Sequence, residues 1–440
     1  MRQCIKGVSE KLMAKSVAVL GGGAAGLCAL RHLVNKPKVF NRVVAYEQAS
    51  QVGGTWVYTE KVGKDEHGLP VMSSMYRNLR TNLPKEVMAF PGYPFPKEWP
   101  SFMTHQQVLQ YLEDFAVHYK LKEHIEFDTI VEKVHPIQFD GKTKWEIHTR
   151  NTIDGKDQTT REEFDAVFVC SGHFSEPMIP DIPSQALFQG DLSHSHDYRY
   201  PEPFTDKVVL FLGAGPSGID IALDIAPVAK TVILCHNKPA LQSLLPANVV
   251  QKPGIKAITR TGVTLLNDEN IEIDALMFCT GYKYTYPFLS SDCHLEIQDG
   301  RVMPLYKHVI HTEHPSLFFV GICQTICPFP MFHMQVLFAV ASLDGTMKLP
   351  TKAVMDQDIM KDYRWRISEL DWPHRYAHKM GEHQWAYNNS LAELAGLRKV
   401  PRVVESLYDH VHHIRTIQVC EYKEHNYELI DDEHFKTVEN

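Results

Sequence analysis

Two glycine-rich segments, far apart in the chain, have the residue types that hold a dinucleotide. The residues concerned are Gly21, Gly23 and Gly26 in the first segment and Gly213, Gly215, Ser217 and Gly218 in the second. In such a turn the first glycine permits a tight bend, the second lets a pyrophosphate approach the backbone, and the third lets the helix pack closely on the strand. The helix that follows directs unpaired N–H groups at the phosphates. Because each segment follows an apolar run, we expect two dinucleotide sites.

Charged residues after two apolar runs indicate which sugars these sites bind. Glu47 ends the run 42–46, about 20 residues past the first glycines, where a carboxylate can bind a ribose hydroxyl. After the second segment, the run 231–235 leads to His236 and Lys238 without an acid. Basic side chains suit the 2′-phosphate of NADPH, so these two residues are candidates for binding it. Two nucleotides held against each other are the layout of a flavoenzyme supplied by a nicotinamide cofactor.

The composition is that of a globular protein with a large core. The 440 residues carry a net charge of −8, so no basic excess indicates nucleic acid or anionic lipid as a partner. The nine cysteines are scattered and several lie beside apolar runs, which predicts buried reduced thiols. We expect the close pair Cys323 and Cys327 to be structural, with a redox disulfide as the alternative. The sequence has no metal-ligand spacing, and we expect no metal.

Apolar runs also bear on the location of the protein. We find no unbroken run of the ~20 apolar residues that a spanning helix needs. Residues 1–15 carry charges and lack the apolar core of a signal peptide. We therefore expect a soluble, cytoplasmic protein without a membrane anchor. The alternative is a protein secreted after removal of a signal peptide that is absent from this sequence.

The order of the apolar runs predicts an interrupted first domain. Runs at 16–20, 42–46, 164–169 and 317–321 predict its strands, and a second α/β unit covers about 206–315. We predict a helix over 104–120 with Thr104 as its N-cap, an apolar helix over 334–343, and mainly helices over 332–440. The expected fold is α/β with two Rossmann-like dinucleotide-binding domains, the NADP domain inserted into the FAD domain. The expected parts are 1–172 (FAD-binding, first part), 173–320 (linker plus NADP-binding) and 321–440 (FAD-binding, second part, and C-terminal helices).

Several further motifs together resemble one family. The most specific is the segment 188–198, FQGDLSHSHDY, which fits the pattern F-x-G-x-x-x-H-x-x-x-Y/F. Other matches follow in the family's order: Gly53, Gly54 and Trp56 after Glu47, LRTNLP at 79–84, CTGY at 279–282, and PFP at 328–330 with Gln335. By these residues the chain resembles the flavin-containing monooxygenases over nearly its whole length. It looks closest to short soluble insect members, some of which N-oxygenate plant pyrrolizidine alkaloids.

The resemblance implies an FAD- and NADPH-dependent monooxygenase. In that family NADPH reduces FAD, reduced flavin and O2 give a C4a-hydroperoxyflavin, and one oxygen atom passes to a soft nucleophile. The nucleophile is a tertiary amine or alkaloid nitrogen or a sulfide sulfur, which points to alkaloid detoxification and xenobiotic metabolism. The implied partners are this small molecule and O2, with a homo-oligomer possible.

The resemblance also assigns roles to residues. Asn82 is the implied catalytic residue. The implied FAD-binding residues are Gly21, Gly23, Gly26, Glu47, Gly54, Trp56, Thr81 and Gln335, and the implied NADP-binding residues are Gly213, Gly215, Ser217, Gly218, His236 and Lys238. Asn237 stands where many members have an arginine, so we expect a less strict preference for NADPH than the family's.

Alternatives stay open at this point. Asn82 precedes Leu83 and Pro84 and could cap a turn instead. His194 is expected to link domains by a hydrogen bond rather than to act as a base. A second class of function is a two-dinucleotide flavin reductase or NADPH oxidase without oxygen transfer. A third is a protein without catalytic activity that binds dinucleotides and senses redox state.

Overall fold

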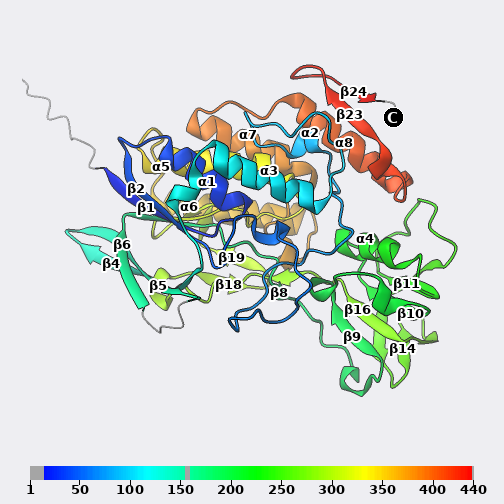
Figure 1. Cartoon of the computed structure of the whole chain (residues 1–440). Helices are drawn as coiled ribbons and strands as arrows, with labels where there is room; N and C mark the ends of the chain where they lie inside the picture. Colours follow the sequence, from blue (N-terminus) through cyan, green and yellow to red (C-terminus); the bar gives the residue numbers. More distant parts are fainter. Residues whose placement is uncertain (1–13, 154–158, 439–440) are drawn as a thin grey trace, which may run out of the picture.

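Two mainly parallel sheets carry the two glycine segments (Figure 1). The computed structural model describes residues 14–153 and 159–438. The first sheet has seven strands in the order β20-β21-β22-β7-β1-β2-β3, and its strands from β22 to β3 are parallel. Their bounds are β1 Lys15–Leu20, β2 Phe40–Tyr46, β3 Ile125–Glu126, β7 Ala166–Val169, β20 Leu305–Tyr306, β21 Ile310–His311 and β22 Leu317–Phe319.

The second sheet has five parallel strands in the order β12-β11-β10-β16-β9. Their bounds are β9 Asp191–His194, β10 Val208–Leu212, β11 Thr231–Cys235, β12 Val249–Lys252 and β16 Ala275–Phe278. Strand β16 is buried throughout, as apolar strands covered on both faces are. Figure 1 places this unit, mainly in green, to the lower right of the first sheet.

The chain leaves the first sheet and later returns to it. After β7 it builds the whole second sheet, and it then adds β20, β21 and β22 to the first. On its return, Leu317 of β22 pairs with Val167 of β7 in parallel register. This is the expected α/β fold with one dinucleotide unit inserted into the other. The domain limits at 172 and 320 stay a prediction.

Eight α-helices complete the two units in the described part of the chain. They are α1 Ala24–Val34, α2 Lys85–Met88, α3 His105–His118, α4 Pro216–Ile225, α5 Pro328–Leu343, α6 Lys352–Arg364, α7 Gln384–Ala395 and α8 Arg402–Ile417. Helix α1 packs against β1, β2 and β7 and also against α5 and α3. The two glycine turns lead into α1 and α4.

The structure tests both predicted helices. Helix α3 begins as expected, because Thr104 and Gln107 form a reciprocal capping box. Helix α5 begins at Pro328, earlier than the predicted Met334. A proline fits the first turn of a helix, where its missing N–H needs no partner, so the PFP segment starts the helix and does not precede it.

Smaller antiparallel sheets accompany the two main sheets. They are β4 Thr129–Phe139, β5 Lys142–Asn151 and β6 Thr159–Phe164; β13 Ile255–Ile258, β14 Gly262–Leu265 and β15 Asn270–Glu272; and the pairs β8 Glu176–Pro177 with β17 Tyr282–Lys283, β18 Glu296–Gln298 with β19 Arg301–Met303, and β23 Asn426–Leu429 with β24 Phe435–Val438. The C-terminal part is mainly helical, as expected, and the hairpin of β23 and β24 is added to its helices α5 to α8.

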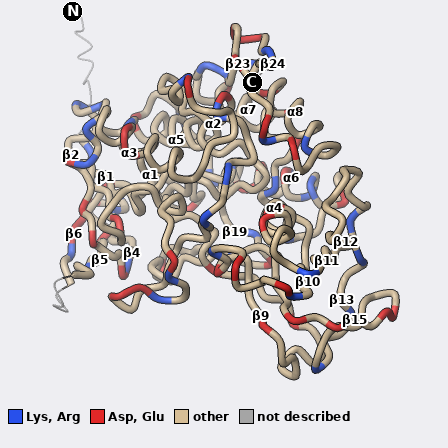
Figure 2. Tube along the Cα trace, turned by 45° about the vertical axis from the view of Figure 1, so that its right-hand side comes forward, with Lys and Arg blue, Asp and Glu red and all other residues tan. Residues whose placement is uncertain are grey.

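Charges are spread over the surface. Figure 2 shows Lys and Arg interspersed with Asp and Glu along the trace. In the part of the chain that the structure describes, none of the helices is both long and apolar enough to span a membrane.

Candidate functional site

The first glycine turn, between β1 and α1, is shaped by backbone contacts. Gly21 has φ +110°, and a Cβ atom built on it would lie 2.6 Å from the carbonyl oxygen of Cys170. A Cβ on Gly26 would lie 1.8 Å from the carbonyl oxygen of Gly21. Any side chain at either position would force the helix and the strand apart, so the protein fold itself requires these two glycines.

Gly23 differs from its neighbours. A Cβ atom on Gly23 would meet only Gly54, at 3.5 Å, which is ordinary van der Waals contact. Gly23 is the N-cap of α1, and no side chain caps the helix there. Packing therefore does not require a glycine here, while the open space lies at a helix N-terminus with free N–H groups. These features fit a pyrophosphate held against the turn.

The second turn, between β10 and α4, repeats this arrangement. Gly213 has φ +114°, with its Cβ position 2.5 Å from the carbonyl oxygen of Cys279. The Cβ position of Gly218 is 2.0 Å from the carbonyl oxygen of Gly213. A Cβ on Gly215 would meet nothing within 4 Å, and Ser217 is exposed in the first turn of α4. In both turns, therefore, the first and last glycines are required by packing, while the middle glycine leaves the open space that a dinucleotide phosphate needs.

Glu47 follows β2 and contacts the first turn directly. Its carboxylate accepts the N–H of Gly22 at 2.6 Å and that of Ala49 at 2.8 Å. Burial raises the pKa of Glu47, and these backbone N–H groups act in the opposite direction. The carboxylate therefore fixes the turn, a role that the sequence did not indicate. Its contact with a ribose stays a prediction.

The GG-x-W segment lies against the first turn. The N–H of Gly53 donates to the carbonyl oxygen of Gly22 at 3.2 Å. Gly54 has φ +56°, and its Cβ position is 3.0 Å from the Cα of Gly23. Trp56 ends the short 3-10 helix Gly54–Trp56 and packs, partly buried, on the main core. The structure thus brings these predicted FAD-binding residues together.

Asn82 lies in a segment held by the start of α3. The N–H of Thr81 donates to the carbonyl oxygen of Met103 at 2.7 Å, and the Met103 N–H donates to Thr81 Oγ1 at 3.1 Å. The half-buried amide of Asn82 makes no hydrogen bond with any other described residue, and α2 begins after Pro84 without a side-chain cap. The turn-capping alternative is therefore not observed. An amide that can both donate and accept remains available to a ligand.

Gln335 of α5 is bonded within the protein. It is fully buried, its Oε1 accepts the Gly321 N–H at 2.9 Å, and its Nε2 donates to Tyr387 Oη at 2.9 Å. Its Nε2 also lies 3.4 Å from Cys323 Sγ. These bonds hold the segment 321–327 against helix α5. Its direct contact with the flavin stays a prediction.

The cysteines of this segment are structural. Cys323 and Cys327 are buried free thiols. Burial raises the pKa of Cys323 to about 12, so it carries no thiolate at neutral pH. This arrangement gives no support to a disulfide reductase.

The segment that returns from β22 to α5 is held by a second stretch of chain. The N–H of Gln324 donates to the carbonyl oxygen of His378 at 2.9 Å, and the N–H of Met380 donates back to the Gln324 carbonyl at 2.9 Å. The N–H of Cys327 donates to Gln384 Oε1 at 2.6 Å at the start of α5. The sequence did not indicate these residues. A signal was present in Gln384 and Asn388, two uncharged polar residues one turn apart on a buried helix face.

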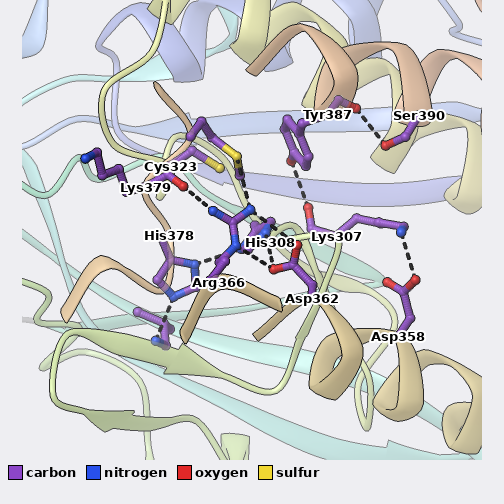
Figure 3. Close-up of polar contacts among 12 residues, drawn as sticks. Lys307, His308, Cys323, Asp358, Asp362, Arg366, His378, Lys379, Tyr387 and Ser390 are labelled. Carbon is purple, nitrogen blue, oxygen red and sulfur yellow. Dashed lines mark hydrogen bonds and ion pairs between the residues drawn. The ribbon is translucent and has the colours of Figure 1, made fainter. Parts of the chain in front are cut away.

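Two buried histidines, His308 and His378, form a hydrogen-bonded chain, here called the histidine relay, that holds the residues around His378 in place (Figure 3). The Val302 N–H donates to His378 Nε2 at 2.9 Å, and His378 Nδ1 lies 2.9 Å from His308 Nδ1. His308 Nε2 faces Asp362 at 3.3 Å, and Asp362 pairs with Arg366 at 2.8 Å. Because the Val302 N–H occupies His378 Nε2, the proton of His378 lies on Nδ1 and that of His308 on Nε2.

Burial decides the charge of this relay. It lowers the pKa of His308 and lowers that of His378 further, so both rings are neutral at pH 7. Burial alone would raise the pKa of Asp362, but the bonds from His308 and Arg366 outweigh it and keep that pKa well below its usual range. A cavity of about 250 Å³ adjoins these residues. The polar groups of His308, His378, Asp362 and Arg366 all have protein partners, which is typical of residues that stabilise a fold rather than bind a ligand.

The strand β11 ends in the two basic candidates for the second nucleotide. His236 is fixed by Gln251 Oε1 at 3.1 Å and by the carbonyl oxygen of Lys238 at 3.1 Å. Asn237 Oδ1 accepts the Gly254 N–H at 3.1 Å. Lys238 is exposed, and its ammonium has no partner among the described residues. These bonds hold the turn at His236 and Asn237, and contact of His236 or Lys238 with a phosphate stays a prediction.

The segment 188–198 differs in one detail from the expectation that His194 links domains by a hydrogen bond. His194 Nδ1 accepts the His196 N–H at 3.0 Å, which is a local bond. His196 Nε2 instead bonds the distant carbonyl oxygen of Val71 at 3.0 Å. His196 is therefore the residue that links segments. Burial lowers the pKa of His194, so its ring is neutral at pH 7.

Comparisons with known proteins place this geometry in a family. The family model described as FMO-like, "Flavin-binding monooxygenase-like", matches residues 14–243 and 236–409. The chain is 38% identical over 423 residues to "Flavin-containing monooxygenase FMO GS-OX-like 4" of Arabidopsis thaliana, covering 89% of this chain and 90% of that protein. It is 36% identical over 403 residues to "Flavin-containing monooxygenase FMO GS-OX4" of the same plant, covering 87% and 85%.

Solved structures give the same result. The S-allyl-L-cysteine S-oxygenase of Allium sativum superposes with a TM-score of 0.86 at 34% identity, covering 94% of this chain and 96% of that one. Tmm from Pelagibacter sp. superposes with a TM-score of 0.82 at 27% identity, covering 93% and 92%.

The contrast between the glycines of the first turn generates a prediction. Gly23→Ala should fold normally, because its Cβ has room, but its methyl group would occupy the space of the pyrophosphate. We expect a protein with the melting behaviour of the apo wild type that purifies without yellow colour. Gly26→Ala should instead lower stability whether or not FAD is present. Full retention of FAD by the folded Gly23→Ala protein, measured by absorbance per mole of protein, would contradict the assignment of this turn.

Proposed function

The chain belongs to the flavin-containing monooxygenase family, and from this premise we propose which atoms it oxygenates and which residues take part. It is a monooxygenase that depends on FAD and NADPH and oxygenates heteroatoms. We propose that the oxygen passes from O2 to a soft nucleophile, either a sulfide sulfur or the nitrogen of a tertiary amine or alkaloid. The name of one solved relative, an S-allyl-L-cysteine S-oxygenase, supports the sulfur arm.

The observation that carries the proposal is the unbonded amide of Asn82 in a chain with two glycine turns whose middle glycines leave room for a phosphate. When bound, FAD supplies the activated oxygen after reduction by NADPH. We propose that Gly23, Glu47, Gly54, Trp56 and Thr81 hold FAD. Gly215, Ser217, His236 and Lys238 are proposed to hold NADPH.

Asn82 is the proposed catalytic residue. Its amide is neutral, so it can donate and accept hydrogen bonds without placing a charge beside the cofactors. The N–H of Thr81 donates to the Met103 carbonyl oxygen and the Met103 N–H donates to Thr81 Oγ1, which holds the backbone next to Asn82.

The wider setting belongs to the same proposal. We propose a cytoplasmic protein that acts on a small molecule, forms a homo-oligomer and has no nucleic-acid partner. The described cysteines are free thiols, as suits a reducing compartment, and the charges of Figure 2 are mixed over the surface. Light scattering after size-exclusion chromatography measures the oligomer.

Product analysis tests the proposed reaction. Purified yellow protein is mixed with NADPH and a panel of sulfides, tertiary amines and alkaloids, and NADPH loss, hydrogen peroxide and oxygenated product are measured together. We expect an S-oxide or N-oxide in near-equal amount to the NADPH consumed for at least one substrate class. If every substrate gives hydrogen peroxide alone, the protein is an NADPH oxidase instead.

Asn82 generates a second prediction. Asn82→Asp keeps the size of the side chain but adds a negative charge beside an electron-rich cofactor. We expect the variant to consume NADPH at a rate close to the wild type, while oxygenated product per NADPH falls roughly 10-fold or more and hydrogen peroxide replaces it. The exposed Asn41→Asp is the matched control. Wild-type coupling in Asn82→Asp would remove Asn82 from the active site.

Lys238 generates a third prediction. A single exposed cation on a phosphate contributes about 1–2 kcal/mol, so Lys238→Ala should raise the KM for NADPH roughly 5- to 30-fold. The KM for NADH should change little, because NADH has no 2′-phosphate. Lys230→Ala, at the opposite end of the same strand β11, should change neither value. An unchanged ratio of the two KM values in Lys238→Ala would place the phosphate site elsewhere.

A further inference from the structure

The segment after α8, residues 418–424, joins the second nucleotide unit to the rest of the protein. The N–H of Val419 donates to Ser243 Oγ at 2.9 Å, and Cys420 Sγ lies 3.6 Å from the carbonyl oxygen of Leu244. Lys423 Nζ lies 2.5 Å from Asp220 Oδ1 on α4. In Figure 1 the end of α8 lies above α4, which agrees with these contacts. Three bonds thus tie a C-terminal segment to the unit that carries the second glycine turn.

Asp220 is the centre of this contact. It lies in the first half of α4, shortly after Ser217 of the glycine turn. Its Oδ1 pairs with Lys423 and its Oδ2 accepts the hydroxyl of Tyr76, so both carboxylate oxygens have partners. One turn further along α4, Asp224 accepts Asn78 Nδ2 at 2.9 Å. The same face of α4 is therefore bonded to the segment that leads to Asn82.

Lys423 also bonds that segment directly. Its Nζ donates to the carbonyl oxygen of Arg80 at 3.2 Å, and the Arg80 guanidinium donates back to the Lys423 carbonyl at 2.6 Å. The carbonyl of Arg80 belongs to the peptide that precedes Thr81 and Asn82. Lys423 Nζ thus lies between the nucleotide-binding helix α4 and the backbone next to Asn82.

The surroundings shield this pair from solvent more than an ion pair on the surface is shielded. The side chains of Lys423 and Asp220 are 15% and 26% exposed. Tyr76 is buried, and its burial together with Asp220 raises its pKa well above the usual range, so its hydroxyl remains a donor. Partial burial weakens screening by water and salt, and removal of one partner leaves the other under-solvated.

We propose that Lys423 is a positioning residue that couples occupancy of the second nucleotide turn to the position of Asn82. A nucleotide bound at Gly215 and Ser217 orders the N-terminal turn of α4, and Asp220 and Lys423 transmit that order to the Arg80 carbonyl. This deepens the proposed function, because Asn82 would then be held in place only while NADP is bound. A simple brace between the domains would stabilise the segment equally with and without the nucleotide.

Hydrogen exchange of the apo and NADP⁺-bound protein separates these two roles. In the wild type we expect NADP⁺ to slow exchange of the backbone amides at 80–83 roughly fivefold, an effect of the size that local ordering produces. Lys423→Met keeps the side-chain length and loses the charge, and it should abolish that slowing. Asp220→Asn, which keeps the shape of its side chain, should also abolish the slowing. Lys423→Arg, which keeps the positive charge, should retain it. Lys436→Met on the C-terminal hairpin is the matched control.

The functional readout follows from the same variants. Lys423→Met should reduce flavin at a rate within about twofold of the wild type and release more of its NADPH as hydrogen peroxide, as expected for a group that acts after hydride transfer. The exchange measurement needs only NADP⁺, so it decides the proposal even if the wild type makes no oxygenated product. Full NADP⁺-dependent protection in Lys423→Met, or an equal loss of protection in Lys436→Met, would overturn the proposal.

Discussion

The contact between helix and strand at each glycine turn is the constraint on which both nucleotide units depend. At the first turn the Cβ position of Gly26 falls 1.8 Å from the carbonyl oxygen of Gly21, and at the second that of Gly218 falls 2.0 Å from Gly213. Only a backbone without side chains allows this approach. The approach sets the direction of α1 and α4, and with it the place where the N–H groups of each helix meet a phosphate. A methyl group at Gly26 or Gly218 would displace the helix, and its N–H groups would no longer be directed at the phosphate.

Around these turns the protein relies on neutral donors and acceptors more than on charge. Glu47 is held by backbone N–H groups, Thr81 by a peptide, and Gln335 by a backbone N–H and a tyrosine hydroxyl. The relay of His308 and His378 is neutral at pH 7, and bonds from His308 and Arg366 keep the pKa of Asp362 below its usual range. A charged pair, Lys423 with Asp220, lies where α4 meets the C-terminal segment, beside the backbone that precedes Asn82.

Local signals in the sequence predicted much of this arrangement. The glycine spacings, the apolar runs and the Thr104 cap lie within short windows, and the two turns, their strands and helix α3 follow from them. The sheet of β4, β5 and β6 was missed because its strands are half exposed and rich in charge, so they lack the alternation of a buried strand. The pairs Lys423–Asp220 and His308–Asp362 were missed for a different reason. Each joins residues far apart in sequence, and each partner alone is typical of a surface residue.

The middle glycines, Gly23 and Gly215, are under a different selection from the other glycines of the two turns. Gly21, Gly26, Gly213 and Gly218 serve the fold, so selection for a stable protein is sufficient to keep them. Gly23 and Gly215 have room for a methyl group, so the fold does not require glycine there, and in the proposed sites it is the bound nucleotide that keeps them small. A descendant that lost its cofactor but kept its shape would be free to change these two positions first. In a lineage of this fold, the middle glycine therefore records whether the dinucleotide is still in use.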